Sequence, residues 1–177
     1  MSDNFLVITA LGRDQPGIVN TLSKAALDCG CNIANSRMAV LGGEFALILL
    51  ISGSDDAVAT MQQHLPALED QLQLTIIAKL TAPRAAEQRW IPYRVRVVAM
   101  DHPGIVHSIT EFFCSRKINI EELETEAYAA PHTGATMFSL LMTVAVPAAV
   151  PIGQLREFFI DFCDGLNLDA SFEAARD

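Results

Sequence analysis

Basic residues are scarce in this sequence, and their scarcity limits what the protein can bind. The 177 residues include 12 Lys and Arg against 21 Asp and Glu, a formal net charge of −9. A DNA-binding surface concentrates Lys and Arg, because release of counterions from phosphates supplies most non-specific affinity. We therefore expect no direct nucleic-acid binding, so that any role in gene regulation runs through a protein partner.

Cysteine and histidine are also few, and their spacing fits neither a disulfide framework nor a metal site. The pair Cys29 and Cys31 encloses one glycine, a spacing that closes neither a usual disulfide nor a zinc ribbon. None of the four histidines stands at ligand spacing from this pair. The sequence predicts no metal site and no cofactor. The cysteines are expected to be small thiols in a reducing compartment.

Long apolar runs are missing as well. No stretch approaches the roughly 20 apolar residues that span a bilayer. The N-terminus carries Asp3 and no basic residue before a short β-branched run, which is not typical of a signal peptide. We expect a cytoplasmic protein without membrane contact, and the 51% of hydrophobic residues indicates that it folds.

What the sequence does contain is an internal repeat. Residues 11–19 (LGRDQPGIV) match residues 98–106 (VAMDHPGIV) at an offset of 87 positions. Asn32-Ile33 recurs as Asn119-Ile120 at the same offset. Two dissimilar motifs held at one constant spacing indicate a tandem duplication.

In each copy the spacing of apolar residues alternates between that of a strand and that of a helix in the same order, which predicts a βαββαβ unit. Such a unit forms a four-stranded antiparallel sheet with two helices on one face, the ferredoxin-like arrangement of the α+β class. We place the tandem domains at residues 1–82 and 93–177, with a linker at 83–92. The expected elements are strands 5–11, 32–41, 44–52 and 74–80 with helices 16–30 and 55–72, then strands 94–100, 119–129, 135–146 and 168–172 with helices 103–116 and 152–165.

Four local patterns refine this outline. Gly42-Gly43 supplies the positive φ angles of a tight hairpin, and Pro66 predicts a break or kink near His64-Leu65 in the second helix. Apolar residues on both faces of 46–51 suggest that the sheet packs against another domain or chain, so we expect a homo-oligomer through sheet or helix faces. Four glutamates indicate a charged edge strand or a patch for a basic partner: Glu121, Glu122, Glu124 and Glu126.

The Asp-x-Pro-Gly turn after the first strand is the candidate binding site. Pro16 is expected to begin the helix, where a backbone N–H would have no partner within the helix and its absence costs nothing. Gly17 has no side chain to block a ligand. The free N–H groups and dipole of the helix start favour a carboxylate, and Asp14 or nearby strand carbonyls would accept from an ammonium group. The site predicted for a small amino acid comprises Asp14, Gln15, Pro16, Gly17, Ile18, Asn32 and Ile33.

A purely structural role accounts for the same residue types. Asp14 would then cap the helix with its side chain, Gly17 would serve close packing, and Asn32 would be a left-handed turn residue. The structural role is favoured in the second copy, where Arg116-Lys117 replaces Cys29-Gly30. The weaker ligand candidates of that copy are Asp101, His102, Gly104, Asn119 and Ile120.

A βαββαβ unit whose first strand ends in Asp-x-Pro-Gly-Ile-Val resembles the ACT domain, a small-molecule regulatory module of amino-acid metabolism. Both halves carry the motif, at 14–19 and 101–106. With CGCNI at 29–33 and LGGEF at 41–45, the free-standing pair is similar to the glycine cleavage system transcriptional repressor family. The resemblance implies a regulator that responds to a small amino acid, glycine in this family, and acts on a LysR-type transcriptional activator.

Two other functions compete with this interpretation. One is a free-standing regulatory subunit that binds an amino acid and docks on a metabolic enzyme. The other is an enzyme, for instance a remnant of the folate-dependent deformylases that begin with a similar module. An enzyme would need a further catalytic domain, and the two repeats use up the residues. We therefore expect no catalytic activity.

Overall fold

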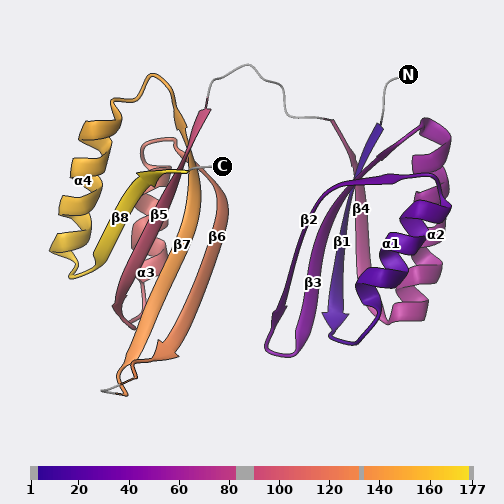
Figure 1. Cartoon of the computed structure of the whole chain (residues 1–177), viewed down its shortest axis with the longest axis horizontal. Coiled ribbons are helices and arrows are strands. Elements are labelled where there is room, and N and C mark those ends of the chain that lie inside the picture. The colour runs from indigo at the N-terminus through magenta and orange to yellow at the C-terminus, as the bar shows by residue number, and fades with distance from the viewer. Residues whose placement is uncertain (1–3, 83–89, 132–133, 176–177) are drawn as a thin grey trace. The chain divides into compact units, whose positions relative to one another are not determined.

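The computed structural model describes residues 4–82, 90–131 and 134–175, and the chain divides into two compact units, Met1–Ala85 and Ala86–Asp177 (Figure 1). The first unit contains β1 (Asn4–Arg13), α1 (Ile18–Asp28), β2 (Asn32–Leu41), β3 (Glu44–Gly53), α2 (Asp55–Leu72) and β4 (Leu74–Thr81). The second contains β5 (Trp90–Met100), α3 (Ile105–Cys114), β6 (Asn119–Ala129), β7 (Thr136–Pro147), α4 (Ile152–Gly165) and β8 (Asp169–Ala174).

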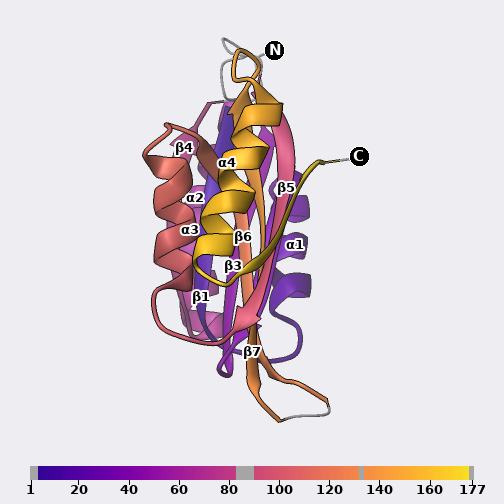
Figure 2. The ribbon, with the colours of Figure 1, turned by 90° about the vertical axis from the view of Figure 1, so that its left-hand side faces the viewer.

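Each unit is a four-stranded antiparallel sheet with two helices, as the sequence predicts. The strand orders are β2-β3-β1-β4 and β6-β7-β5-β8, so the first and third strands of each repeat lie in the centre. Figure 1 shows α1 and α2 together on one face of the first sheet, and Figure 2 shows α3 and α4 together on the second. The ferredoxin-like α+β fold is confirmed for both copies.

The repeat extends to backbone details. A register shift between Ile33 and Asn35 in β2 recurs between Ile120 and Glu122 in β6, 87 positions later. The first hairpin is closed by Gly42-Gly43 with φ angles of 61° and 92°, which confirms the predicted tight turn. The two copies therefore share one backbone design despite their different side chains.

The helices of each unit cover one face of its sheet and form a separate core there. Strand alternation turns Leu6, Ile8 and Ala10 of β1 toward the helices, all with 0% exposure. The first core is mostly aliphatic, whereas the second is built around Phe112, Phe113 and other aromatic rings. Each domain thus buries its own apolar surface. Within the described residues no helix is long and apolar enough to cross a membrane.

Two predictions about where helices begin and end are wrong. Helix α1 begins at Ile18 rather than at Pro16, because Gly17 adopts a left-handed conformation that no helix can contain. Helix α2 runs without a break through Pro66. Leu68 and Leu72, beyond the proline, are buried against the first core, and this burial offsets the hydrogen bond that proline cannot donate.

The segment between the domains is only partly described. Residues 83–89 of the predicted linker lie outside the described residues. Residues 90–92 belong to β5, which begins four residues before the predicted strand. Trp90 pairs with Pro147 and Ile91 with Val146 in the ladder between β5 and β7. A proline at position 92 hid this extension, since proline is uncommon inside a strand.

Candidate functional site

The first Asp-x-Pro-Gly turn is fixed to two other parts of its domain. The backbone N–H of Asp14 donates to the carbonyl of Gly43 at 3.1 Å, which ties the turn to the β2–β3 hairpin. The side-chain amide of Gln15 donates to the carbonyl of Leu72 at 2.7 Å, at the end of α2. The turn is therefore held at two points although Asp14 and Gln15 are exposed.

Gly17 is required by the backbone of this turn rather than by packing. Its φ and ψ are 98° and −8°, a region that side chains strongly disfavour. A Cβ atom added there would meet no heavy atom within 4 Å. Its carbonyl accepts from the N–H of Thr21 at 2.9 Å, which makes Gly17 the N-cap of α1. The interpretation of Gly17 as a close-packing residue is therefore wrong.

The start of α1 has backbone donors that no side chain satisfies. No side-chain hydrogen bond caps this helix, so the alternative in which Asp14 acts as its cap is wrong. The first turn of α1 contains no acidic residue. Backbone N–H groups and the helix dipole at such an end favour a negatively charged group. A carboxylate ligand at this turn stays a prediction, and Ile18, which is buried, could offer only its backbone.

A hollow of about 380 Å³ lies beside this turn. It brings together three of the predicted residues, Asp14, Gln15 and Pro16, with others that sequence reasoning missed. Those additional lining residues are Arg13, Leu72 and Gln73. Arg13 directly precedes the motif in the sequence. A basic residue next to a predicted carboxylate site could have been recognised as a candidate ligand contact. Leu72 and Gln73 could be found only from the fold.

Asn32 and Ile33 do not join the turn within one domain. Asn32 pairs with Ser52, and Ser52 pairs with Phe5, nine residues before Asp14 along β1. At about 3.4 Å per residue, this places the two groups roughly 30 Å apart, at opposite ends of the sheet. The prediction of one site within a single domain is wrong. A small ligand cannot contact both groups within one domain.

The alternative role of Asn32 and Asn119 is also wrong, because neither is a left-handed turn residue. Both are the first residues of strands. The left-handed positions are two residues earlier, at Gly30 with φ 74° and Lys117 with φ 58°. Sequence reasoning placed the bend correctly in the helix-to-strand connection but assigned it to the wrong residue.

The second turn repeats the backbone of the first but is less firmly held. The N–H of Asp101 donates to the carbonyl of Thr136 at 2.9 Å, and Gly104 caps α3 with φ 100°. His102, at the position of Gln15, lies 3.1 Å from the carbonyl of its neighbour Pro103. Among the described residues, His102 has no side-chain hydrogen bond to a second helix equivalent to the bond between Gln15 and α2. The weaker ligand role assigned to this copy remains a prediction.

Asn119 and Ile120 again lie at the far end of their sheet. Ile120 pairs with Val144, which pairs with Tyr93, eight residues before Asp101. They line a separate hollow of about 520 Å³ together with residues of α3, namely Thr110, Glu111 and Cys114, and with Lys117 and Ile118. The turn and the Asn-Ile pair are thus separated in both copies.

The cysteines form no metal site within the described part of the chain, where no group of three His, Cys, Asp or Glu could hold an ion. The Cys29 sulfur lies 3.5 Å from Nδ1 of His64. Burial, with a smaller contribution from the charge of Asp28, raises the pKa of the Cys29 thiol. This thiol is held in its protonated form, which is the wrong form for a metal ligand or a nucleophile.

Comparisons with known proteins identify the family. The ACT domain family model matches residues 4–79. The glycine cleavage system transcriptional repressor of Escherichia coli (strain K12) is 36% identical over 170 residues, which covers 96% of this chain and 90% of that protein. A repressor of the same name from Shigella flexneri matches to the same extent. The chain belongs to the glycine cleavage system transcriptional repressor family.

Solved structures agree with this family and with its tandem ACT domains. A crystal structure of a candidate glycine cleavage system transcriptional repressor matches 100% of both chains, at 30% identity and a TM-score of 0.73. An unknown protein from Galdieria sulphuraria matches 99% of this chain and 100% of its own length, at 27% identity and a TM-score of 0.79. The family expected from the two Asp-x-Pro-Gly motifs is thereby confirmed.

Proposed function

We propose that this protein is an amino-acid-responsive regulator of transcription that acts in the cytoplasm through a protein partner and has no catalytic activity. The observation that carries the proposal is its 36% identity, over 96% of the chain, to a glycine cleavage system transcriptional repressor. The partner implied by the family resemblance is a LysR-type transcriptional activator. The regulator binds this activator and blocks or releases it according to amino-acid supply.

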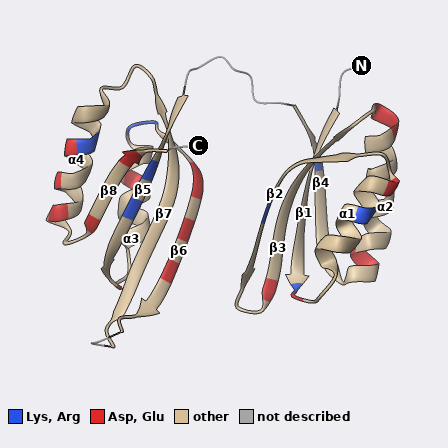
Figure 3. Cartoon of the chain, in the orientation of Figure 1, with Lys and Arg blue, Asp and Glu red and all other residues tan. Residues whose placement is uncertain are grey.

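The distribution of charge supports action through a protein. Figure 3 shows the Lys and Arg of the described residues scattered over both domains, apart from neighbouring pairs on β5 and after α3. The net charge is −9. A chain of this kind repels the phosphate backbone rather than releasing its counterions. Contacts to the promoter are therefore assigned to the partner.

The effector is a small amino acid, with glycine favoured by the family. Its carboxylate binds the open N–H groups at the start of α1 beside Arg13, and its ammonium group binds the carboxylate of Asp14. Support comes from the hollow that unites Arg13 and Asp14 and from the uncapped helix start. Small ligands of opposite end charges fit such a pair of groups.

Calorimetric titration with glycine, followed by a panel of other amino acids, tests the effector. Asp14→Asn keeps the shape of the side chain and removes its charge, so we expect roughly tenfold weaker binding, the loss of one charged hydrogen bond. Asp101→Asn is the matched control in the second turn and should leave this binding unchanged. Equal affinity of wild type and Asp14→Asn would remove the first turn from the proposal.

Capture of binding partners from a native extract tests the mechanism. We expect a helix-turn-helix activator to be recovered, and the amount recovered to change when glycine is added. Recovery of a metabolic enzyme instead would favour the second hypothesis, a free-standing regulatory subunit. A shift of promoter DNA by the purified protein alone at physiological salt would contradict the assignment of DNA contacts to the partner.

We also infer that the protein is a homo-oligomer. The uncovered face of the first sheet exposes apolar side chains in adjacent strands, with Leu11 51%, Ile48 48% and Ile77 66% exposed. Sedimentation should show that Ile48→Lys weakens self-association, whereas Leu27→Lys on the outer side of α1 does not.

A further inference from the structure

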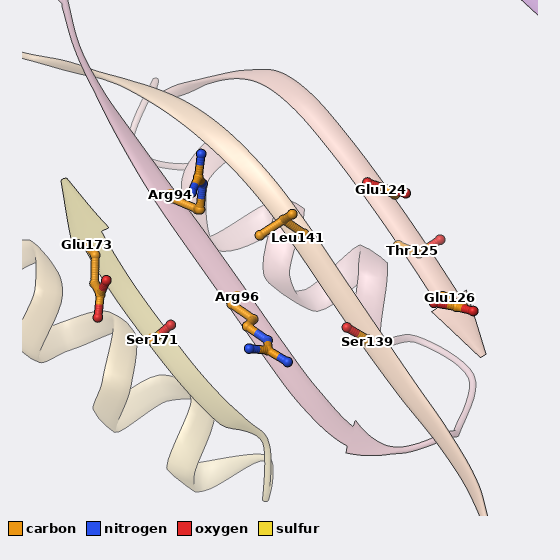
Figure 4. A pocket seen from close by; sticks show the side chains of 9 residues that line it. All are labelled: Arg94, Arg96, Glu124, Thr125, Glu126, Ser139, Leu141, Ser171 and Glu173. Atoms are coloured by element: carbon orange, nitrogen blue, oxygen red, sulfur yellow. The ribbon is translucent and has the colours of Figure 1, made fainter. Parts of the chain in front are cut away.

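The uncovered face of the second sheet is charged, unlike the corresponding face of the first. Its central strand β5 presents Arg94 and Arg96, two residues apart and therefore on the same side of the sheet. Figure 4 shows both arginines between β8 on one side and the glutamates of β6 on the other. These side chains border a hollow of about 570 Å³, within the size range of small-ligand sites.

Strand register places four different chemical groups in one row across this face. Ser171 of β8 pairs with Arg96 of β5, Arg96 pairs with Leu141 of β7, and Leu141 pairs with Glu124 of β6. The row therefore reads hydroxyl, guanidinium, apolar side chain and carboxylate. Leu141 is 40% exposed, an accessible apolar floor between opposite charges.

The charges at the two ends of this row are not satisfied by each other. Within the described residues, Arg96 and Glu124 form no ion pair and no hydrogen bond. Their strands are separated by β7, which puts the two backbones about 10 Å apart. The neighbouring Glu122 differs, since it accepts a hydrogen bond from Thr143 at 3.5 Å. Arg96 and Glu124 are thus the groups available to a ligand.

The order of the four groups across the sheet favours one class of ligand. Guanidinium groups bind carboxylates in a planar, two-point geometry, with Ser171 as an additional hydroxyl donor. A carboxylate such as Glu124 binds ammonium, and Leu141 favours an apolar stem between the two. Phosphate is disfavoured, because Glu124 and the other acidic residues on this face repel a second negative charge.

We propose that the uncovered face of the second sheet binds a small zwitterion whose two charges are separated by an apolar stem, and 6-aminohexanoate is a simple probe of this kind. The carboxylate lies on Arg96, the ammonium group on Glu124 and the stem on Leu141. This site goes beyond the proposed function, because it uses neither the Asp14 turn nor a partner protein. It gives the second domain, whose own turn is the weaker candidate, a separate ligand.

Backbone amide NMR of the full chain during titration with 6-aminohexanoate tests the proposal. We expect saturable shifts at Arg96, Leu141 and Ser171, and an affinity for 6-aminohexanoate roughly tenfold above that for glycine, whose two charges are on one carbon and cannot reach both Arg96 and Glu124. Inorganic phosphate should cause no comparable shifts. The Asp14→Asn variant should leave these shifts intact, which separates this site from the effector site of the first domain.

Two pairs of matched variants locate the contacts. Arg96→Gln should weaken 6-aminohexanoate binding at least tenfold, whereas Arg156→Gln on the exposed side of α4 makes the same charge change elsewhere and should not. Glu124→Gln should act like Arg96→Gln, with Glu157→Gln as its control.

Three outcomes would overturn the proposal. The first is no shift on this face at millimolar 6-aminohexanoate, in which case the row of charges only adds electrostatic interactions between strands. The second is an affinity that Arg96→Gln leaves unchanged. The third is equal binding of phosphate, which would make the face a general anion site. A result in which glycine binds at Asp14 but 6-aminohexanoate fails to bind here would reject this site and leave the proposed function standing.

Discussion

Replacement of Gly17 by alanine should destabilise the first domain through the backbone alone. Gly17 has φ 98°, and an added Cβ would meet nothing within 4 Å, so no steric term contributes. A left-handed conformation costs a non-glycine residue about 1–2 kcal/mol, and part of this is recovered because alanine restricts the unfolded chain. We therefore expect Gly17→Ala to lower the free energy of unfolding by about 1 kcal/mol.

Urea unfolding can assign this loss to one domain. Trp90 is the single tryptophan and lies in β5, so its fluorescence reports the second domain, while far-UV circular dichroism reports both. With an m value of about 1–3 kcal/mol/M, Gly17→Ala should lower the midpoint of the first-domain transition by roughly 0.3–1 M. Gly104→Ala, at φ 100° and equally free of neighbours, should cause the same loss in the fluorescence transition.

Two further glycines give controls with different outcomes. Gly12→Ala would place a Cβ 2.8 Å from Cδ2 of Leu74 and 3.0 Å from the carbonyl oxygen of Gln73, so it should cost more than Gly17→Ala. Gly153→Ala lies in α4 with ordinary φ and open space, and should stabilise the second domain by up to about 1 kcal/mol. Equal stability of Gly17→Ala and wild type would refute the argument that backbone strain selects glycine in this turn.

Three other substitutions test the packing and the thiols. Pro66→Ala restores a backbone donor inside the unbroken helix α2 and should raise the free energy of unfolding of the first domain by about 1–3 kcal/mol, measured by circular dichroism. Phe113→Ala removes a fully buried ring that packs edge-on against Phe112 and at a tilt against Phe159, each at 5.2 Å between centroids, and should cost the second domain about 3–5 kcal/mol by Trp90 fluorescence. Burial, with a smaller effect of the neighbouring aspartate, raises the pKa of Cys163 from 9.0 to about 12. Because the unfolded chain releases this proton from about pH 9 while the folded chain keeps it, the second domain should lose stability as pH rises from 9 to 12. Unfolding midpoints over this range should show a smaller loss in Cys163→Ala than in wild type.

The order of elements could be predicted from the sequence because local signals agreed with tertiary packing. The repeated turns and the Gly42-Gly43 pair marked the ends of strands, and apolar alternation marked the buried face. Prediction failed where a long-range contact outweighed a local preference. Pro66 is a helix breaker by itself, but the buried Leu68 and Leu72 hold the helix together beyond it.

The candidate site was predictable in its parts and not in their placement. The Asp-x-Pro-Gly motif identified the turn and its glycine. That Asp14 and Asn32 lie at opposite ends of one sheet follows only from strand direction and register. The row across the second sheet was missed for the same reason, although the alternation of Arg94 and Arg96 in the sequence already placed both on one face.

The two domains have kept their backbone while their uncovered faces have diverged. Both sheets repeat the same bulge, the same capping glycine and the same bond from the turn to the hairpin. On one sheet the uncovered face is apolar around Ile48, and on the other it carries Arg96 and Glu124. An apolar face gains free energy by excluding water against another protein surface, whereas separated opposite charges gain most from a ligand that pairs with both. This contrast is the basis for proposing self-association through the first sheet and binding of a small zwitterion on the second.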